Sequence, residues 1–148
     1  MKHSEAQLNR FLVEVFHDVM RLEEQELLKG PFKNLSVSEM HVIEAACDGQ
    51  DKSSNSMAAL AARLRVSAGT LTIAVKTLEQ KGYLLRERSR SDRRRVLVAP
   101  TSLGRKAYDV HRQFHERLVA AVAENLSPAG MDALAQALST LHRFFDSL

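Results

Sequence analysis

One segment in the middle of the chain, residues 56–98, constrains the fold most. Its apolar residues first recur at helical spacing, with Gly82 placed to end the second of two helices, and then give way to two short strands around a polar hairpin. A helix, a tight turn and a second helix form a compact unit that can present one helix face outward. The expected elements are helices 57–64 and 68–81 and strands 83–88 and 95–98.

Helical patterns also flank this segment on both sides. The apolar stripes predict long helices at both ends of the chain and a second helix after Gly30-Pro31, followed by a polar loop. The predicted fold class is therefore mainly α with a small β-hairpin. We expect a single domain over 1–148, in which residues 36–100 form one lobe. The other expected elements are helices 5–29, 36–47, 101–122 and one starting near 128, and a loop at 48–55.

The composition is that of an ordinary globular protein, with 45% hydrophobic and 26% charged residues. The N-terminal ten residues are polar, and no run approaches the roughly 18 apolar residues of a membrane span, so we expect a cytoplasmic protein without membrane contact. The single cysteine, Cys47, leaves no disulfide framework and no cysteine-rich zinc module. Because it sits late in a helix, a buried structural thiol is favoured over a redox sensor.

Positive charge is concentrated in the middle of the chain. Residues 56–106 carry twelve Lys/Arg and three acidic residues, a net charge of +9, whereas the two ends together carry −6. A basic segment between acidic flanks is typical of a protein that binds a polyanion. Charge alone does not distinguish DNA from RNA or an anionic membrane.

The second helix of the pair has the composition of a DNA-reading helix. Leu71, Val75 and Leu78 share its inner face, which leaves small, hydroxyl-bearing and basic residues on the outer face. Ser67 is expected to cap the helix and to contact a phosphate as well. The alternative is an ordinary surface face. The candidate DNA-binding residues on this helix are Ser67, Gly69, Thr70, Thr72, Ile73, Lys76 and Thr77.

The hairpin favours DNA over an ordinary solvated turn. Residues 81–95 include seven Lys/Arg and only two acidic residues, Glu87 and Asp92. The repulsion among so many positive charges would be reduced by bound phosphates. Arginines at a hairpin tip can enter a narrow minor groove, and Asp92 is expected to hold one of them in a bidentate pose. The candidate DNA-binding residues here are Arg88, Arg90, Asp92, Arg93 and Arg94.

Three stretches together resemble the MarR family of winged helix-turn-helix regulators. These are Leu78-Glu-Gln-Lys-Gly-Tyr-Leu84, the hairpin sequence Ser91-Asp92-Arg93-Arg94-Arg95-Val96, and Thr101-x-x-Gly104, where Ala99-Pro100 replaces the usual Leu before the Thr. The resemblance implies a sequence-specific transcriptional regulator, most often a repressor, that binds double-stranded DNA as a homodimer. The dimerisation helices would lie in 1–35 and 101–148, whose apolar faces exceed what one small domain buries.

A more local likeness points to one branch of that family. Glu23-Glu24, Phe32-Lys33, the run from Ser36 to His41 and His111-x-x-Phe114-His115 resemble the branch that represses fatty-acid biosynthesis genes, with acyl carrier protein as corepressor. The same branch resemblance implies an acyl ligand as effector and no required cofactor.

Zinc is the alternative effector. His111 and His115 lie four residues apart on one helix face, a spacing that lets two imidazoles share a metal, although such a pair is more often structural. With Glu24 and His41 they resemble the ligand set of the zinc-responsive branch. The sequence does not decide whether Glu23 or Glu24 faces the effector pocket that the resemblance implies. The competing interpretation is that these residues form a polar, hydrogen-bonded floor to a pocket for an acyl ligand.

An enzyme is not expected. The sequence holds no glycine-rich phosphate loop, nucleophile elbow or His-Glu-x-x-His motif. The competing function is a winged-helix module that binds a protein instead of an operator. Such a module should carry aromatic residues and Met among its charges, and this hairpin does not.

Overall fold

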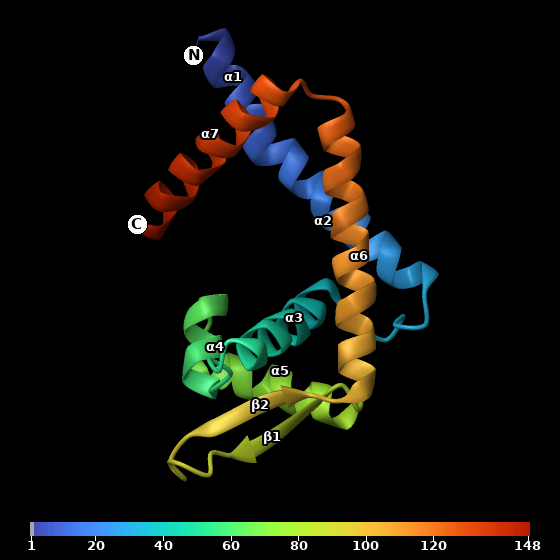
Figure 1. Ribbon diagram of the computed structural model, residues 1–148, viewed down its shortest axis with the longest axis vertical. Coiled ribbons are helices and arrows are strands. Elements are labelled where there is room, and N and C mark those ends of the chain that lie inside the picture. The colour runs from blue at the N-terminus through green and yellow to red at the C-terminus, as the bar shows by residue number, and fades with distance from the viewer. Residues whose placement is uncertain (1) are drawn as a thin grey trace. The chain divides into compact units, whose positions relative to one another are not determined.

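The computed structural model describes residues 2–148 and confirms a mainly helical fold with one β-hairpin (Figure 1). Its contacts divide into two compact units, one ending at His111 and the other spanning Arg112–Leu148, so the boundary falls inside one continuous helix. The elements are α1 (His3–Arg10), the π-helical η1 (Phe11–Val15), α2 (Phe16–Lys29), α3 (Val37–Asp51), α4 (Met57–Leu64), α5 (Ala68–Gln80), β1 (Leu84–Arg88), β2 (Val96–Pro100), α6 (Ser102–Glu124) and α7 (Pro128–Asp146).

Serine side chains begin four of these helices. Ser36, Ser56, Ser67 and Ser127 each accept a hydrogen bond from the backbone N–H three residues later, which satisfies one of the free donors of the first turn. At Ser36 the capping box is complete, because the Glu39 carboxylate accepts the Ser36 backbone N–H in return.

The core of the first unit lies between α3, α4, α5 and the hairpin. Three inner residues of α5, Leu71, Val75 and Leu78, are buried as predicted. They join a cluster whose largest fully buried members include Met40 and Ile43 of α3. The rotation of α5 about its axis is therefore fixed by apolar packing.

The hairpin is antiparallel and tied to the start of α4. Leu84 pairs with Pro100 and Arg88 with Val96. Asn55, just before α4, accepts the Val98 backbone N–H with its carbonyl (2.8 Å) and donates its side-chain amide to the Val98 carbonyl (2.8 Å). The β2 strand begins one residue later than predicted and includes Pro100, where the sequence pattern placed its end at Val98.

Two helices differ from their predicted form. The loop expected at 48–55 begins only after Asp51, because α3 continues for another turn. Hydrogen bonds and an ion pair from other elements stabilise that turn. Asp48 accepts hydrogen bonds from Arg63 (2.7 Å) and Tyr108 (2.6 Å). Asp51 forms an ion pair with Arg105 (2.8 Å). The first predicted helix is interrupted by η1, a π-helical segment that apolar periodicity does not reveal.

The start of α6 packs directly on the chain that leaves α5. The Thr101 backbone N–H donates to the Tyr83 carbonyl (3.0 Å), and the Thr101 hydroxyl donates to the Gly82 carbonyl (2.6 Å) while accepting the Gly104 N–H (3.1 Å). A Cβ on Gly104 would lie 2.2 Å from the Tyr83 carbonyl oxygen. The Thr-x-x-Gly motif is thus a cap followed by a close backbone approach.

The second unit contains the rest of α6 and all of α7, which starts at Pro128 as predicted and is capped by Ser127. No single helix within residues 2–148 is both long and apolar enough to cross a membrane.

Gly104 provides a test of the packing at the start of α6. We expect Gly104→Ala to lower the free energy of unfolding by about 1 to 3 kcal/mol, because the added methyl meets backbone atoms that cannot move aside. Gly69→Ala is the matched control, since a Cβ there has no neighbour within 4 Å. That change should stabilise the protein by about 0.5 to 1 kcal/mol through helix propensity. Urea unfolding measures both, and equal effects would contradict the packing.

Cys47 is predicted to be chemically inert in the folded protein. The side chain is fully buried in α3, and this burial raises the pKa of its thiol to about 12, so the thiolate is negligible at neutral pH. An aromatic disulfide reagent at pH 7.5 should label the native protein only slowly and label one thiol per chain after denaturation. Rapid labelling of the native protein would show an accessible thiolate instead.

Candidate DNA interface and histidine cluster

The helix pair α4–α5 has the geometry of a helix-turn-helix. The axes of the two helices meet at 108°, within the range of about 90–120° that is usual for this motif. The turn passes through Arg65, which adopts a left-handed conformation at φ 56° and closes α4. Ser67 then caps α5 as predicted, accepting the Thr70 backbone N–H at 3.1 Å.

The outer face of α5 carries the residues predicted to read DNA. Gly69, Thr72, Ile73 and Lys76 are all exposed and follow one another at helical spacing. Thr77 differs from the prediction in being half-buried, at the edge of this face. The structure thus brings the predicted residues onto one side of one helix.

The hairpin tip carries the predicted arginines at its surface. Arg88, Arg90, Arg93 and Arg94 are exposed, and the Arg94 side chain is 93% exposed. Asp92 holds Arg94, but not through the bidentate contact that the sequence analysis expected. One oxygen, Oδ1, accepts both the Arg94 backbone N–H (3.1 Å) and its Nε–H (3.3 Å). At a separation of two residues the backbone N–H is the nearer donor, so the carboxylate closes the turn.

A basic cleft lies between the helix pair and the hairpin. Its volume is about 420 Å³, and Arg86, Arg94 and Arg95 line it together with Ala68 and Thr72 at the start of α5. The positive end of the α5 dipole adds to the charge of these arginines. The cleft is therefore suited to an anionic group such as a backbone phosphate.

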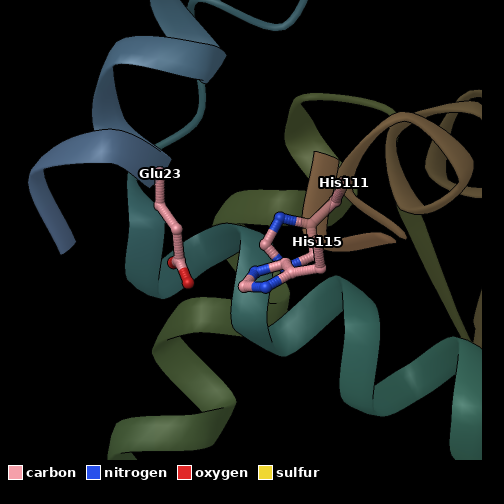
Figure 2. Close-up of side chains that lie close together, drawn as sticks. All are labelled: Glu23, His111 and His115. Carbon is pink, nitrogen blue, oxygen red and sulfur yellow. The ribbon is translucent and has the colours of Figure 1, made fainter. Parts of the chain in front are cut away.

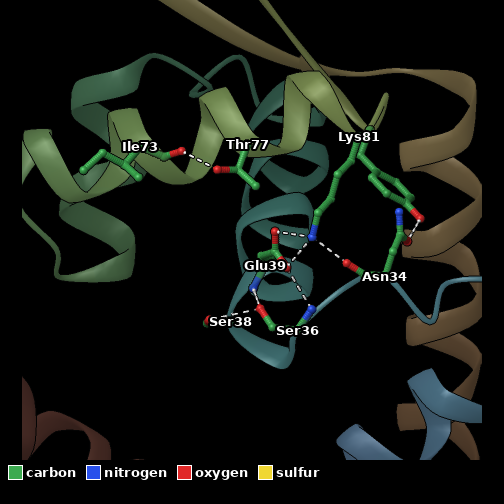
Figure 3. Close-up of polar contacts among 8 residues, drawn as sticks. Asn34, Ser36, Ser38, Glu39, Ile73, Thr77 and Lys81 are labelled. Carbon is green, nitrogen blue, oxygen red and sulfur yellow. Dashed lines mark hydrogen bonds and ion pairs between the residues drawn. The ribbon is translucent and has the colours of Figure 1, made fainter.

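Two of the basic residues whose charge was expected to be neutralised by DNA phosphates already form ion pairs with acidic side chains. Arg86 pairs with Glu79, and Lys81 pairs with Glu39 of α3, its Nζ lying 2.9 Å from Oε2. Lys81 also donates to the Asn34 carbonyl, and the Tyr83 hydroxyl donates to the Asn34 side chain at 2.7 Å (Figure 3). Sequence reasoning missed Glu39 because 42 residues separate it from Lys81.

The Glu39 contact is electrostatically strong. Burial alone would raise the pKa of Glu39, but the hydrogen bonds from the Ser36 backbone and from Lys81 outweigh it and lower the pKa below its usual value. Glu39 is therefore ionised at neutral pH. It holds the end of α5 against the start of α3.

A second polar cluster joins α2, α3 and the first part of α6. Glu23 is 6% exposed and its Oε2 lies 2.8 Å from the Nε2 of His41. His111 is 8% exposed and its Nε2 lies 2.8 Å from the Oε2 of Glu44. The hydrogen bond to His111 lowers the pKa of Glu44 despite its burial. The rings of His41 and His111 are 6.0 Å apart between centroids.

In this cluster the glutamate beside His41 is not the predicted one, and a second glutamate is present that was not predicted. Glu23, not Glu24, is the carboxylate that faces His41, whereas Glu24 is exposed, because consecutive helix residues point about 100° apart. Glu44 was not considered in the sequence analysis, although its position three residues after His41 places both on one face of α3. Figure 2 shows Glu23 on α2, with His111 and His115 on successive turns of α6. In the second unit the His115 ring packs edge-on against Phe114.

Comparison with known proteins agrees with these features. Residues 50–96 match the MarR family model. FabT of Streptococcus pneumoniae, solved in complex with DNA, is 29% identical over 97% of this chain and 98% of that chain, with a TM-score of 0.88. No curated protein sequence matches the chain.

Two further solved structures share the fold. MepR of S. aureus, also in complex with DNA, has a TM-score of 0.78 at 14% identity, covering 93% of this chain and 95% of that chain. MarR of E. coli in its apo form has a TM-score of 0.66 at 23% identity, covering 90% of this chain and 96% of that chain. The helix-turn-helix, the arginine-rich hairpin and the match over residues 50–96 make the chain similar to the MarR family of winged helix-turn-helix transcription regulators.

Proposed function

We propose that this regulator binds a pseudo-palindromic operator as a homodimer and represses the genes that the operator controls. One observation carries the proposal: the outer face of α5 and the exposed arginines of the hairpin belong to the same unit and are both free of the core. A helix of this kind fits the major groove, and arginines at a hairpin tip fit the neighbouring minor groove.

Exposed apolar residues support the homodimer. Soluble monomers seldom expose many large apolar side chains in contiguous patches. The first unit exposes Leu8, Phe11, Leu12, Val13, Val15 and Phe16 near its N-terminus, and the second unit exposes Val119, Val122, Leu126, Leu134, Leu138, Phe144 and Phe145. Helices of this kind, packed between two copies, would space two α5 helices for two half-sites about one DNA turn apart.

Fatty-acid biosynthesis genes are the proposed target. The proposal is supported by the residues that resemble the fatty-acid branch and by the 29% identity to FabT. Acyl carrier protein as a partner rests on the same branch resemblance and stays a prediction.

The competing function, a winged helix that binds a protein, is less well supported. A protein-binding surface of this size is usually enriched in aromatic residues and depleted of charge at its centre. Here the exposed tip consists of arginines, and the basic cleft beside it lies between them and the positive end of α5. Both features suit a polyanion.

We propose zinc as an effector bound by the second polar cluster. Glu23, His41, Glu44 and His111 offer two carboxylates and two imidazoles from three helices, the nitrogen and oxygen donors that zinc accepts. Each imidazole Nε2 already lies 2.8 Å from a carboxylate oxygen, so the donor atoms converge in pairs. A bound ion would replace these two His–Glu contacts with coordination bonds and would connect α2, α3 and α6.

An acyl ligand is the alternative effector, and a separate observation favours it. A cavity of about 560 Å³ lies between α2 and the start of α3, with apolar side chains along it and His17 and Arg21 among its polar lining. Such a cavity suits an apolar chain with an anionic or polar head. Glu24, the predicted zinc ligand, lines this cavity instead.

The operator proposal predicts steep salt dependence. Affinity for a cognate duplex should fall by orders of magnitude between about 50 and 200 mM salt, and Arg90→Ala and Arg94→Ala should each reduce the log–log slope by about 1. Fluorescence anisotropy at several salt concentrations measures this, with analytical ultracentrifugation for the dimer. Affinity that does not change with salt, or a stable monomer, would contradict the proposal.

The zinc proposal predicts a thermal shift. At zinc concentrations about 100-fold above Kd, metal-free protein should gain about 2.7 kcal/mol and melt several degrees higher. His41→Ala combined with His111→Ala should abolish the gain. His142→Ala is the control, because its side chain is exposed on α7. The gain should also shrink as the pH is lowered, because protons compete with the metal for the imidazole nitrogens. If the wild-type melting temperature did not change, the metal would be excluded and the acyl ligand would remain.

A further inference from the structure

An apolar side chain stands exposed at the centre of the DNA-reading face. Ile73 is 71% exposed, more than any other large apolar residue of residues 2–148 except Leu148 near the chain end. Exposing a branched aliphatic side chain to water is unfavourable, and neither helix propensity nor the core requires isoleucine at this position. Its neighbours on the face are Gly69 one turn before it and Lys76 in the next turn.

Two of the threonine hydroxyl groups near Ile73 donate within the protein. Thr72 donates its hydroxyl to the Ala68 carbonyl (2.8 Å) and Thr77 donates its own to the Ile73 carbonyl (3.1 Å), a bond visible in Figure 3. Thr70 accepts the Ser67 hydroxyl at 2.9 Å. Threonines bonded to their own helix in this way keep a methyl group as the other substituent at Cβ. The face around Ile73 is consequently more apolar than its threonine content suggests.

Gly69 lets another molecule approach this apolar face closely. A Cβ at Gly69 would have no neighbour within 4 Å, so nothing inside the chain requires a glycine there. Glycine in an exposed helix costs about 0.5 to 1 kcal/mol relative to alanine, and it removes the side chain that would keep a partner at a distance. The space that it leaves lies one turn from Ile73.

Resting on the proposed operator binding, we infer that Ile73 is a specificity-determining residue that reads the 5-methyl group of a thymine in each half-site. Thymine is the one base that presents an apolar group in the major groove, and aliphatic side chains recognise it by contact. Lys76, the charged group of this face, supplies a contact to a phosphate or to a guanine edge. The exposed arginines of the hairpin contribute affinity that does not depend on the thymine methyl group.

Replacement of thymine by uracil tests the inference, because it removes the methyl group and keeps every hydrogen-bonding atom of the base pair. The probe is a 30-base-pair duplex selected from a random library by the wild-type protein, with deoxyuridine placed at one thymine per half-site at a time. At one symmetric position we expect wild-type affinity to fall about fourfold, the worth of one buried methyl group.

The variants separate Ile73 from the other contacts. Ile73→Ala should bind the thymine and uracil duplexes equally, Ile73→Val should restore part of the preference, and Arg94→Ala should weaken both duplexes while keeping the full preference. Since Ile73 is exposed, the alanine variant should melt at the wild-type temperature.

Three results would overturn the inference, and they differ in what else they affect. If wild type bound selected duplexes but showed no preference for thymine over uracil at any position, Ile73 would not read a methyl. If Ile73→Ala kept the preference, another residue would read it. If wild type bound no duplex even at low salt, operator binding would fail as well, and the exposed Ile73 would mark a surface for a protein partner.

Discussion

The burial of Leu71, Val75 and Leu78 against α3 and the hairpin determines what the rest of this lobe can do. Because these three side chains fix the rotation of α5, they decide that Gly69, Ile73 and Lys76 face outward. The Lys81–Glu39 pair then fixes the far end of the same helix against the capping box of α3. A helix held at its inner face and at one end presents its outer face in one orientation, which sequence-specific recognition requires.

The hairpin and α5 offer DNA side chains of different chemistry. The hairpin tip consists of long, exposed guanidinium groups, whose attraction to phosphates is strong, long in range and indifferent to sequence. On α5 the hydroxyls of Thr72 and Thr77 donate to the helix backbone, which leaves the side chains of Ile73, Lys76 and Thr70 for contacts with bases. In the proposed DNA complex, affinity would therefore depend mainly on the hairpin arginines, and discrimination between sequences mainly on a helix face that carries little charge.

Much of this lobe could be predicted from the sequence, because the signals are local. Periodicity predicted α4 and α5, Ser67 was predicted to cap α5, and the density of arginines predicted an exposed hairpin. The features that could not be predicted depend on contacts between distant residues. The last turn of α3 depends on Arg63, Tyr108 and Arg105, and the pairing of Lys81 depends on a glutamate 42 positions away. The choice between Glu23 and Glu24 required the orientation of α2 relative to α3, which a pattern within one helix does not contain.

α3 connects the proposed effector cluster with the proposed DNA-reading helix α5. Its first turn holds α5 through Glu39, its middle carries His41 and Glu44 opposite α2 and α6, and its last turn holds Arg63 of α4. The buried side chains of α3 and α5 belong to one close-packed core. A shift of α3 would therefore displace the reading helix as well. An effector changes operator affinity only if it binds one position of α3 more tightly than another. A ligand that merely neutralised the Glu23–His41 or Glu44–His111 pair, without moving α3, would change stability and leave operator affinity as it was.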